Sequence, residues 1–180
     1  MKNMDYISFN ASIWDNINEC LTDKSTAISH EEYIAAKNGA LDVTLAGIKK
    51  VPREWFPKLA GADVLGLASG GGQQCPVFAA HGASVTVVDI SEHQLANEKY
   101  VAKRENYKIN IVRADMAKPL PFPDNSFDMI FHPVSNSFLH HFENLVFVAD
   151  FPVTASHKTL LPNRFFSFLM LCPAPKDFAH

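Results

Sequence analysis

Hydrophobic and polar residues alternate in two patterns through the middle of the chain. Four short apolar runs have the length and β-branched composition of buried strands. They cover residues 62–67, 84–89, 109–113 and 127–132. Two stretches of helical composition, 73–81 and 91–106, separate the first three runs, and in the second of them Gln94, Glu98 and Ala102 share one face. Strands that alternate with helices predict an α/β fold with a parallel sheet and flanking helices.

The two ends of the chain have weaker patterns. Near the N-terminus, apolar residues recur every four positions, as on one helix face, at Phe9, Ile13 and Ile17. Ser29 and Glu32 have the spacing of a capping box, which predicts a helix that runs to about Gly39. Near the C-terminus, the apolar run 165–171 predicts a fifth strand.

Length and composition indicate one globular domain. The 180 residues are 47% hydrophobic and 19% charged, which allows a sizeable core. We interpret residues 1–58 as an N-terminal helical or lid segment and residues 59–180 as the ligand-binding part of this single domain. A net charge of −3 without a basic stripe argues against nucleic acid as a partner.

The sequence also bears on where the protein is found. No apolar run approaches the roughly 20 residues that a membrane-spanning helix needs, and the first residues lack the apolar core of a signal peptide. The three cysteines, Cys20, Cys75 and Cys172, are far apart, without the spacing of metal ligands. Reduced thiols of this kind are typical of cytoplasmic proteins, and we expect that location.

Three consecutive glycines, Gly70, Gly71 and Gly72, follow the first predicted strand. Glycine adopts positive φ readily and, because it lacks a Cβ atom, lets a ligand approach main-chain N–H groups. The first free N–H groups of the following helix would point to the same place. This pattern favours a ligand-binding turn, while a tight turn without a ligand is the plainer alternative.

Acidic residues follow the second and third predicted strands. Asp89 ends the second strand, 17 positions after Gly72, and Asp115 follows the third. Ligands of open parallel sheets bind beyond the carboxyl ends of the strands, so one carboxylate can accept the hydroxyls of a ribose and the other an amino group of a base. As alternatives, Asp89 caps the next helix, a role that Ser91 fits better, and Asp115 only begins a turn.

Residues 61–136 resemble the S-adenosylmethionine-binding half of the class I methyltransferases, whose sheet is Rossmann-like. Four motifs carry the resemblance: Val-Leu-Gly-Leu-Ala-Ser-Gly-Gly-Gly at 64–72, Val-Thr-Val-Val-Asp-Ile-Ser at 85–91, Arg-Ala-Asp-Met at 113–116 and Phe-Pro-Asp-Asn-Ser-Phe-Asp-Met-Ile at 122–130. The resemblance implies S-adenosylmethionine as cofactor and methyl transfer to a small-molecule acceptor. The cofactor-binding residues that it implies are Ala68, Ser69, Gly70, Gly71, Gly72, Gln73, Asp89, Ile90, Gln94, Asp115, Met116 and His132.

The same resemblance implies a role for each part of this site. The glycine turn would approach the methionine and ribose, and Asp89 would bind the ribose hydroxyls while Ile90 packs on the adenine. Asp115 would meet the adenine amino group, beside Met116. His132 would face the methyl donor and is the candidate catalytic base, although a structural histidine at a strand end is the plainer alternative.

The chain departs from the family pattern in ways that leave other functions open. Gly66 stands where the family often carries an acid for the methionyl amino group, and Gln73 is the candidate to replace part of that contact. We expect the family's final antiparallel hairpin to be absent, which would expose a sheet edge and favour a homodimer through it. A truncated or non-catalytic adenosyl-binding module and an NAD-dependent oxidoreductase remain alternatives, but the latter would require a Gly-x-Gly-x-x-Gly turn.

Overall fold

A computed structural model describes residues 6–16, 27–45, 49–133, 158–159 and 168–171. Its main feature is a six-stranded sheet with strand order β5-β4-β3-β6-β8-β7. Four of the strands are parallel to one another: β3 (Asp63–Leu67), β4 (Ser84–Asp89), β5 (Ile109–Arg113) and β6 (Met129–His132). These strands confirm the parallel sheet that the four apolar runs predict.

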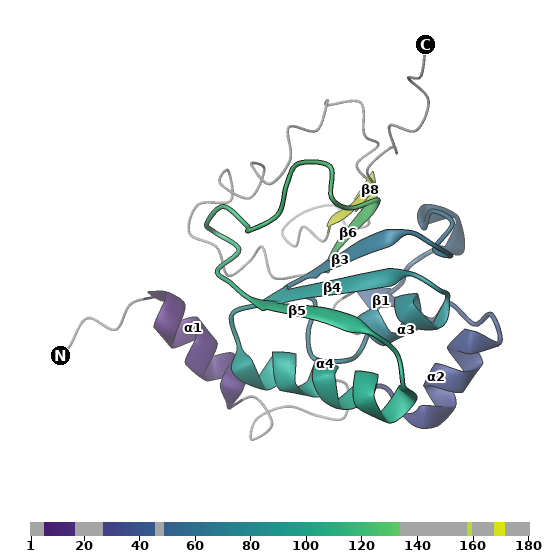
Figure 1. Cartoon of the computed structure of the whole chain (residues 1–180), viewed down its shortest axis with the longest axis horizontal. Coiled ribbons are helices and arrows are strands. Elements are labelled where there is room, and N and C mark those ends of the chain that lie inside the picture. Colours follow the sequence, from purple (N-terminus) through teal and green to yellow (C-terminus); the bar gives the residue numbers. More distant parts are fainter. Residues whose placement is uncertain (1–5, 17–26, 46–48, 134–157, 160–167, 172–180) are drawn as a thin grey trace, which may run out of the picture.

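The faces of the sheet are covered differently (Figure 1). Helices α2 (His30–Lys37), α3 (Cys75–Ala80) and α4 (Glu92–Glu105) pack on one face. On the other face, the described residues form a loop, 114–127, whose Leu120 is buried. Prolines in this loop prevent regular structure, as the sequence indicates.

Side-chain caps determine where the helices begin. The Ser29 hydroxyl accepts a hydrogen bond from Glu32 N (3.2 Å), and the Glu32 carboxylate accepts one from Ser29 N (2.7 Å), so the predicted capping box starts α2. The Ser91 hydroxyl caps α4 by accepting from Gln94 N (3.1 Å). Asn106 ends α4 in a left-handed conformation, with φ 56°.

The N-terminal part of the chain shares the main core. Ala36, Val43 and Val51 are buried together with Val64 of β3 and Phe78 of α3. A two-stranded ladder, β1 (Thr44–Leu45) and β2 (Lys49–Lys50), and a short 3-10 helix, η3 (Arg53–Trp55), lead from α2 into the main sheet. The described part of the segment 1–58 therefore packs against the same core as β3 and α3.

The predicted N-terminal helix forms, but its apolar face is not fully buried. Helix α1 (Tyr6–Asp15) lies beside α4 (Figure 1). Phe9 and Ile13 are about half exposed, at 47% and 46%, and Ile17 falls outside the described residues. None of the described helices is long and apolar enough to cross a bilayer.

The far edge of the sheet corrects one prediction. β8 (Phe168–Leu171) pairs antiparallel with β6, and β7 (Lys158–Thr159) pairs antiparallel with β8. The strand predicted at 165–171 is therefore present over its last four residues, but the expectation of no final antiparallel hairpin is wrong. An apolar run has the same composition in either chain direction, so the pattern could not give the orientation of this strand.

Candidate functional site

Hydrogen bonds bring the predicted site residues together at the carboxyl ends of the parallel strands. Ala68 N donates to Val88 O (2.8 Å) and Ala114 N to Asp89 O (3.1 Å), which joins the ends of β3, β4 and β5. His132, at the end of β6, lies 2.8 Å from the Leu67 carbonyl through its Nδ1 atom. The turn after β3 thus has Asp89 on one side and His132 on the other, as the strand order of a parallel sheet requires.

The turn after β3 has an unusual backbone. Ala68, Gly70 and Gly72 have positive φ angles of 45°, 94° and 87°. A Cβ atom on Gly70 would lie 2.5 Å from Gln73 Oε1, and one on Gly71 would lie 2.5 Å from Gln94 Oε1. The side chains of both glutamines therefore lie directly against the turn, and the positive φ of Gly70 disfavours any other residue there.

Asp89 is a buried carboxylate beside this turn. Only 7% of the residue is exposed, and its Oδ1 accepts a hydrogen bond from Ser91 N (2.9 Å). Burial raises the pKa of Asp89 to about 6; the nearby Asp15 carboxylate adds to the rise, and the Ser91 and Ile90 N–H groups oppose it. Because the Ser91 hydroxyl caps α4, the Asp89 side chain does not have to serve as the cap of that helix.

Helix α1 reaches this carboxylate from a distant part of the sequence. Asp15, at the end of α1, accepts hydrogen bonds from the Ser91 hydroxyl (2.6 Å) and from His93 N (3.2 Å). Gln94 Nε2 donates to the Trp14 carbonyl (3.4 Å). The N-terminal helix is thereby attached to the first turn of α4, next to Asp89.

Asp115 begins a turn after β5. Its Oδ1 accepts from Ala117 N (2.9 Å), and its Oδ2 lies 3.7 Å from the Lys118 ammonium group. This geometry confirms the turn that the sequence left open, while the adenine contact remains a prediction. Ile90 and Met116 are both partly exposed beside their aspartates.

His132 is buried, with 3% of its surface exposed. A carbonyl only accepts hydrogen bonds, so the contact with Leu67 O places the proton on Nδ1. Burial lowers the pKa of His132 to about 4, which the bond to Leu67 only partly opposes. At neutral pH this imidazole is uncharged and a weak proton acceptor.

Glu98, for which the sequence analysis predicts no role, lies directly behind the turn. This residue of α4 is 1% exposed, and its Oε1 accepts a hydrogen bond from Gly72 N (2.8 Å). Burial raises the pKa of Glu98 to about 8; the Gly72 N–H opposes the rise and the charge of Asp89 adds to it. The sequence places Glu98 on one helix face with Gln94 and Ala102, but only the structure shows that this face is buried.

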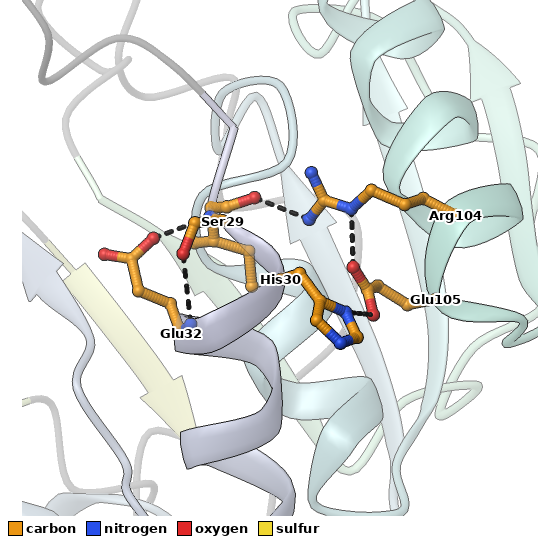
Figure 2. Close-up of polar contacts among 6 residues, drawn as sticks. Ser29, His30, Glu32, Arg104 and Glu105 are labelled. Atoms are coloured by element: carbon orange, nitrogen blue, oxygen red, sulfur yellow. Dashed lines mark hydrogen bonds and ion pairs between the residues drawn. The ribbon is translucent and has the colours of Figure 1, made fainter.

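A polar cluster on α4 also holds the chain that leads into α2 (Figure 2). Arg104 donates to the Ile28 carbonyl (2.6 Å) and to Glu105 (2.5 Å), and Glu105 lies 2.9 Å from His30 Nδ1. Although burial opposes ionisation, Arg104 and His30 hold the pKa of Glu105 below its ordinary value. Ile28 N in turn donates to the Gly72 carbonyl (2.9 Å).

Comparisons with known proteins agree with this geometry. Residues 65–150 match a family model described as a methyltransferase domain. An uncharacterized methyltransferase of Bacillus subtilis, YbaJ, is 42% identical over 135 residues, which are 75% of this chain and 53% of that protein. Over these residues the chain is similar to the class I S-adenosylmethionine-dependent methyltransferases. It spans about half the length of this curated relative.

Solved structures extend the comparison to the fold of this chain. The [4+2]-cyclase SpnF matches with a TM-score of 0.50 and 17% identity, over 76% of this chain and 52% of that chain, which shows the fold alone. A second structure, an S-adenosylmethionine-dependent methyltransferase from Mesorhizobium loti, is 33% identical over 43% of this chain and 35% of its own, with a TM-score of 0.39.

The chain departs from the methyltransferase pattern at Gly66 for a reason visible in the structure. A Cβ atom at this position would lie 2.3 Å from Cys75 Sγ and 2.7 Å from Ser69 Oγ. The buried thiol of Cys75 occupies the space that an acidic side chain would need, and burial raises the pKa of that thiol well above its ordinary value. An acid at Gly66 is therefore incompatible with Cys75 in its present position.

Proposed function

We propose that the protein binds S-adenosylmethionine and transfers its methyl group to a small-molecule acceptor. One observation carries the proposal: a turn with three positive φ angles lies at the end of β3, with the buried Asp89 carboxylate beside it at the end of β4. The turn lets a ligand approach the backbone, and a carboxylate at this place suits the two hydroxyls of a ribose. Asp115 follows on the next strand, where it supports an adenine contact.

The chemistry asks little of the protein beyond position. S-Adenosylmethionine supplies an activated methyl group, so the chain has to bind it, orient the acceptor and exclude water. His132 has the place of a candidate base, but its low pKa makes it a poor proton acceptor at neutral pH. We therefore assign it to holding the end of β3 through Leu67, with the acceptor's own acidity deciding whether a base is needed.

The rest of the predicted setting stays part of the proposal. We place the protein in the cytoplasm as a single domain, without nucleic acid as a partner, in which the described residues of the segment 1–58 (6–16, 27–45 and 49–58) pack beside the site and core. Pairing of two copies through the sheet edge is also proposed, although β7 now covers the edge of β8 on which that expectation rested. Because a protein named as a cyclase shares this fold, a non-methylating adenosyl-binding function is the second candidate.

Isothermal titration calorimetry with S-adenosylhomocysteine, S-adenosylmethionine and NAD tests the proposal. We expect micromolar binding of S-adenosylhomocysteine and about tenfold weaker binding by Asp89→Asn, because one charged hydrogen-bond acceptor for the ribose is lost. Asp63→Asn is the matched control, since Asp63 lies at the opposite end of β3. Binding of NAD alone would favour an oxidoreductase, and equal affinity of both variants would remove Asp89 from the site.

A further inference from the structure

Gly72, the last glycine of the turn, is held from behind by helix α4. Its N–H donates to the buried carboxyl of Glu98 at 2.8 Å, across 26 positions of sequence. A Cβ atom on Gly72 would lie 2.9 Å from Val101 Cγ2, one helical turn after Glu98. The turn and the helix are therefore in direct contact, and Glu98 provides the hydrogen bond between them.

The other peptide group of Gly72 is fixed as well. Its carbonyl accepts a hydrogen bond from Ile28 N, and the Ile28 carbonyl accepts one from Arg104 of α4. Both sides of this residue, which has a φ of 87°, are thus tied to α4, directly or through one intervening residue. The conformation of the turn depends on where α4 holds it.

The surroundings of Glu98 favour an uncharged carboxyl. The described groups that face it are Asp89 at the end of β4, Cys75 on α3 and Tyr107 after α4. None of these three can carry a positive charge. Glu98 Oε2 and the Tyr107 hydroxyl have no hydrogen-bond partner among the described residues. No described donor therefore stabilises a negative charge on Oε2, which favours the protonated carboxyl.

We propose that Glu98 is a positioning residue for the adenosyl-binding turn, which its uncharged carboxyl holds in the binding conformation through Gly72. This inference rests on the proposed function, because it assumes that the turn binds an adenosyl group. An ionised Glu98 would place an unpaired negative charge beside Asp89, inside the protein. Water can solvate that charge only if the turn and α4 separate, which disturbs the site.

The expected consequence is a loss of affinity in alkaline solution. With a pKa of about 8, Glu98 is uncharged near neutrality and loses its proton above that value. The affinity for the adenosyl group should therefore fall as the pH rises through about 8. Asp89 titrates near 6, at the other end of the range, so the two effects are separable.

The test measures the affinity for S-adenosylhomocysteine by calorimetry from about pH 6.5 to about pH 9.5. We expect the wild type to lose about tenfold in affinity above pH 8, and Glu98→Gln, which keeps the acceptor but cannot ionise, to lose much less. Glu98→Leu removes the acceptor from Gly72 and should bind about tenfold more weakly at every pH. Any titration of the ligand itself is common to all forms.

Glu92→Gln is the matched control, because it changes an exposed glutamate of the same helix. This variant should follow the wild type at every pH. Equal losses for the wild type and Glu98→Gln, or a wild-type affinity that does not change with pH, would overturn the inference. Failure of every form to bind at any pH would instead refute the adenosyl site on which the inference depends.

Discussion

Replacement of Glu98 by glutamine should stabilise the free protein, and more so as the pH rises. In the folded state the pKa of Glu98 is about 8, against an ordinary value of 4.5. The unfolded chain therefore releases this proton first, and the wild type loses stability between these two values, whereas glutamine has no proton to release. Below about pH 4.5 both forms carry an uncharged side chain and should be equally stable.

The size of the effect follows from the same two values. One pKa unit corresponds to about 1.4 kcal/mol, so the full difference amounts to roughly 5 kcal/mol above pH 8 and about 3 kcal/mol at pH 7, as upper bounds. The fully buried position of the carboxyl justifies the conversion, because little solvent screens it. Glutamine should retain the hydrogen bond from Gly72, since its Oε1 atom can accept it.

Urea unfolding at a series of pH values from about 4.5 to about 9 measures the effect. The difference in the free energy of unfolding between Glu98→Gln and the wild type should grow as the pH rises from about 4.5 and level off above about 8. His132 also titrates, but both forms carry it, so its effect cancels from the difference, while the effect of the Asp89 charge on Glu98 is already part of the pKa of about 8. Parallel curves for the two proteins would show that Glu98 ionises normally in the folded state, and our account of its surroundings would fail.

Two further predictions concern residues at the carboxyl ends of the parallel strands. Gly72→Ala should lower the free energy of unfolding by about 1–3 kcal/mol more than Gly61→Ala, as measured by urea unfolding. Both glycines have positive φ, but only a Cβ atom on Gly72 meets neighbours, at 2.9 Å, so equal losses would contradict the role of crowding. His132, whose pKa is about 4 instead of 6.5, should make the protein lose up to roughly 3 kcal/mol as the pH falls from 6.5 to 4. The His132→Gln variant, followed by thermal unfolding over this pH range, should not lose this stability. A loss as large as that of the wild type would show that His132 is not its source.

The sequence predicted the parallel part of the fold well because the signals there are local. The run Val85–Val88 is β-branched and apolar, which suits a strand covered on both faces, and β4 forms over Ser84–Asp89 as expected. The caps at Ser29 and Ser91 are local as well, since each involves residues three positions apart. Parallel pairing then brings Asp89 beside the glycine turn without further information.

The remaining features depend on contacts between distant parts of the chain. Asp15 meets Ser91 across 76 positions, and nothing in the neighbourhood of either residue indicates it. The orientation of β8 depends on which strand it meets, and its apolar pattern is silent on direction. Glu98 looked like one polar residue of an ordinary helix, because burial of a carboxylate is visible only when the glycine turn is placed over it.

The contribution of Ala36, Val43 and Val51 to the main core has a practical consequence for protein engineering. A recombinant version that starts at Leu59 would keep every motif of the family. It would lack the side chains of Ala36, Val43 and Val51, which share the core with Val64 and Phe78. It would also deprive the Gly72 carbonyl of Ile28 N. Expression trials that trim this protein to its recognisable motifs should therefore yield aggregates, whereas versions that retain residues 27–58 should remain in solution.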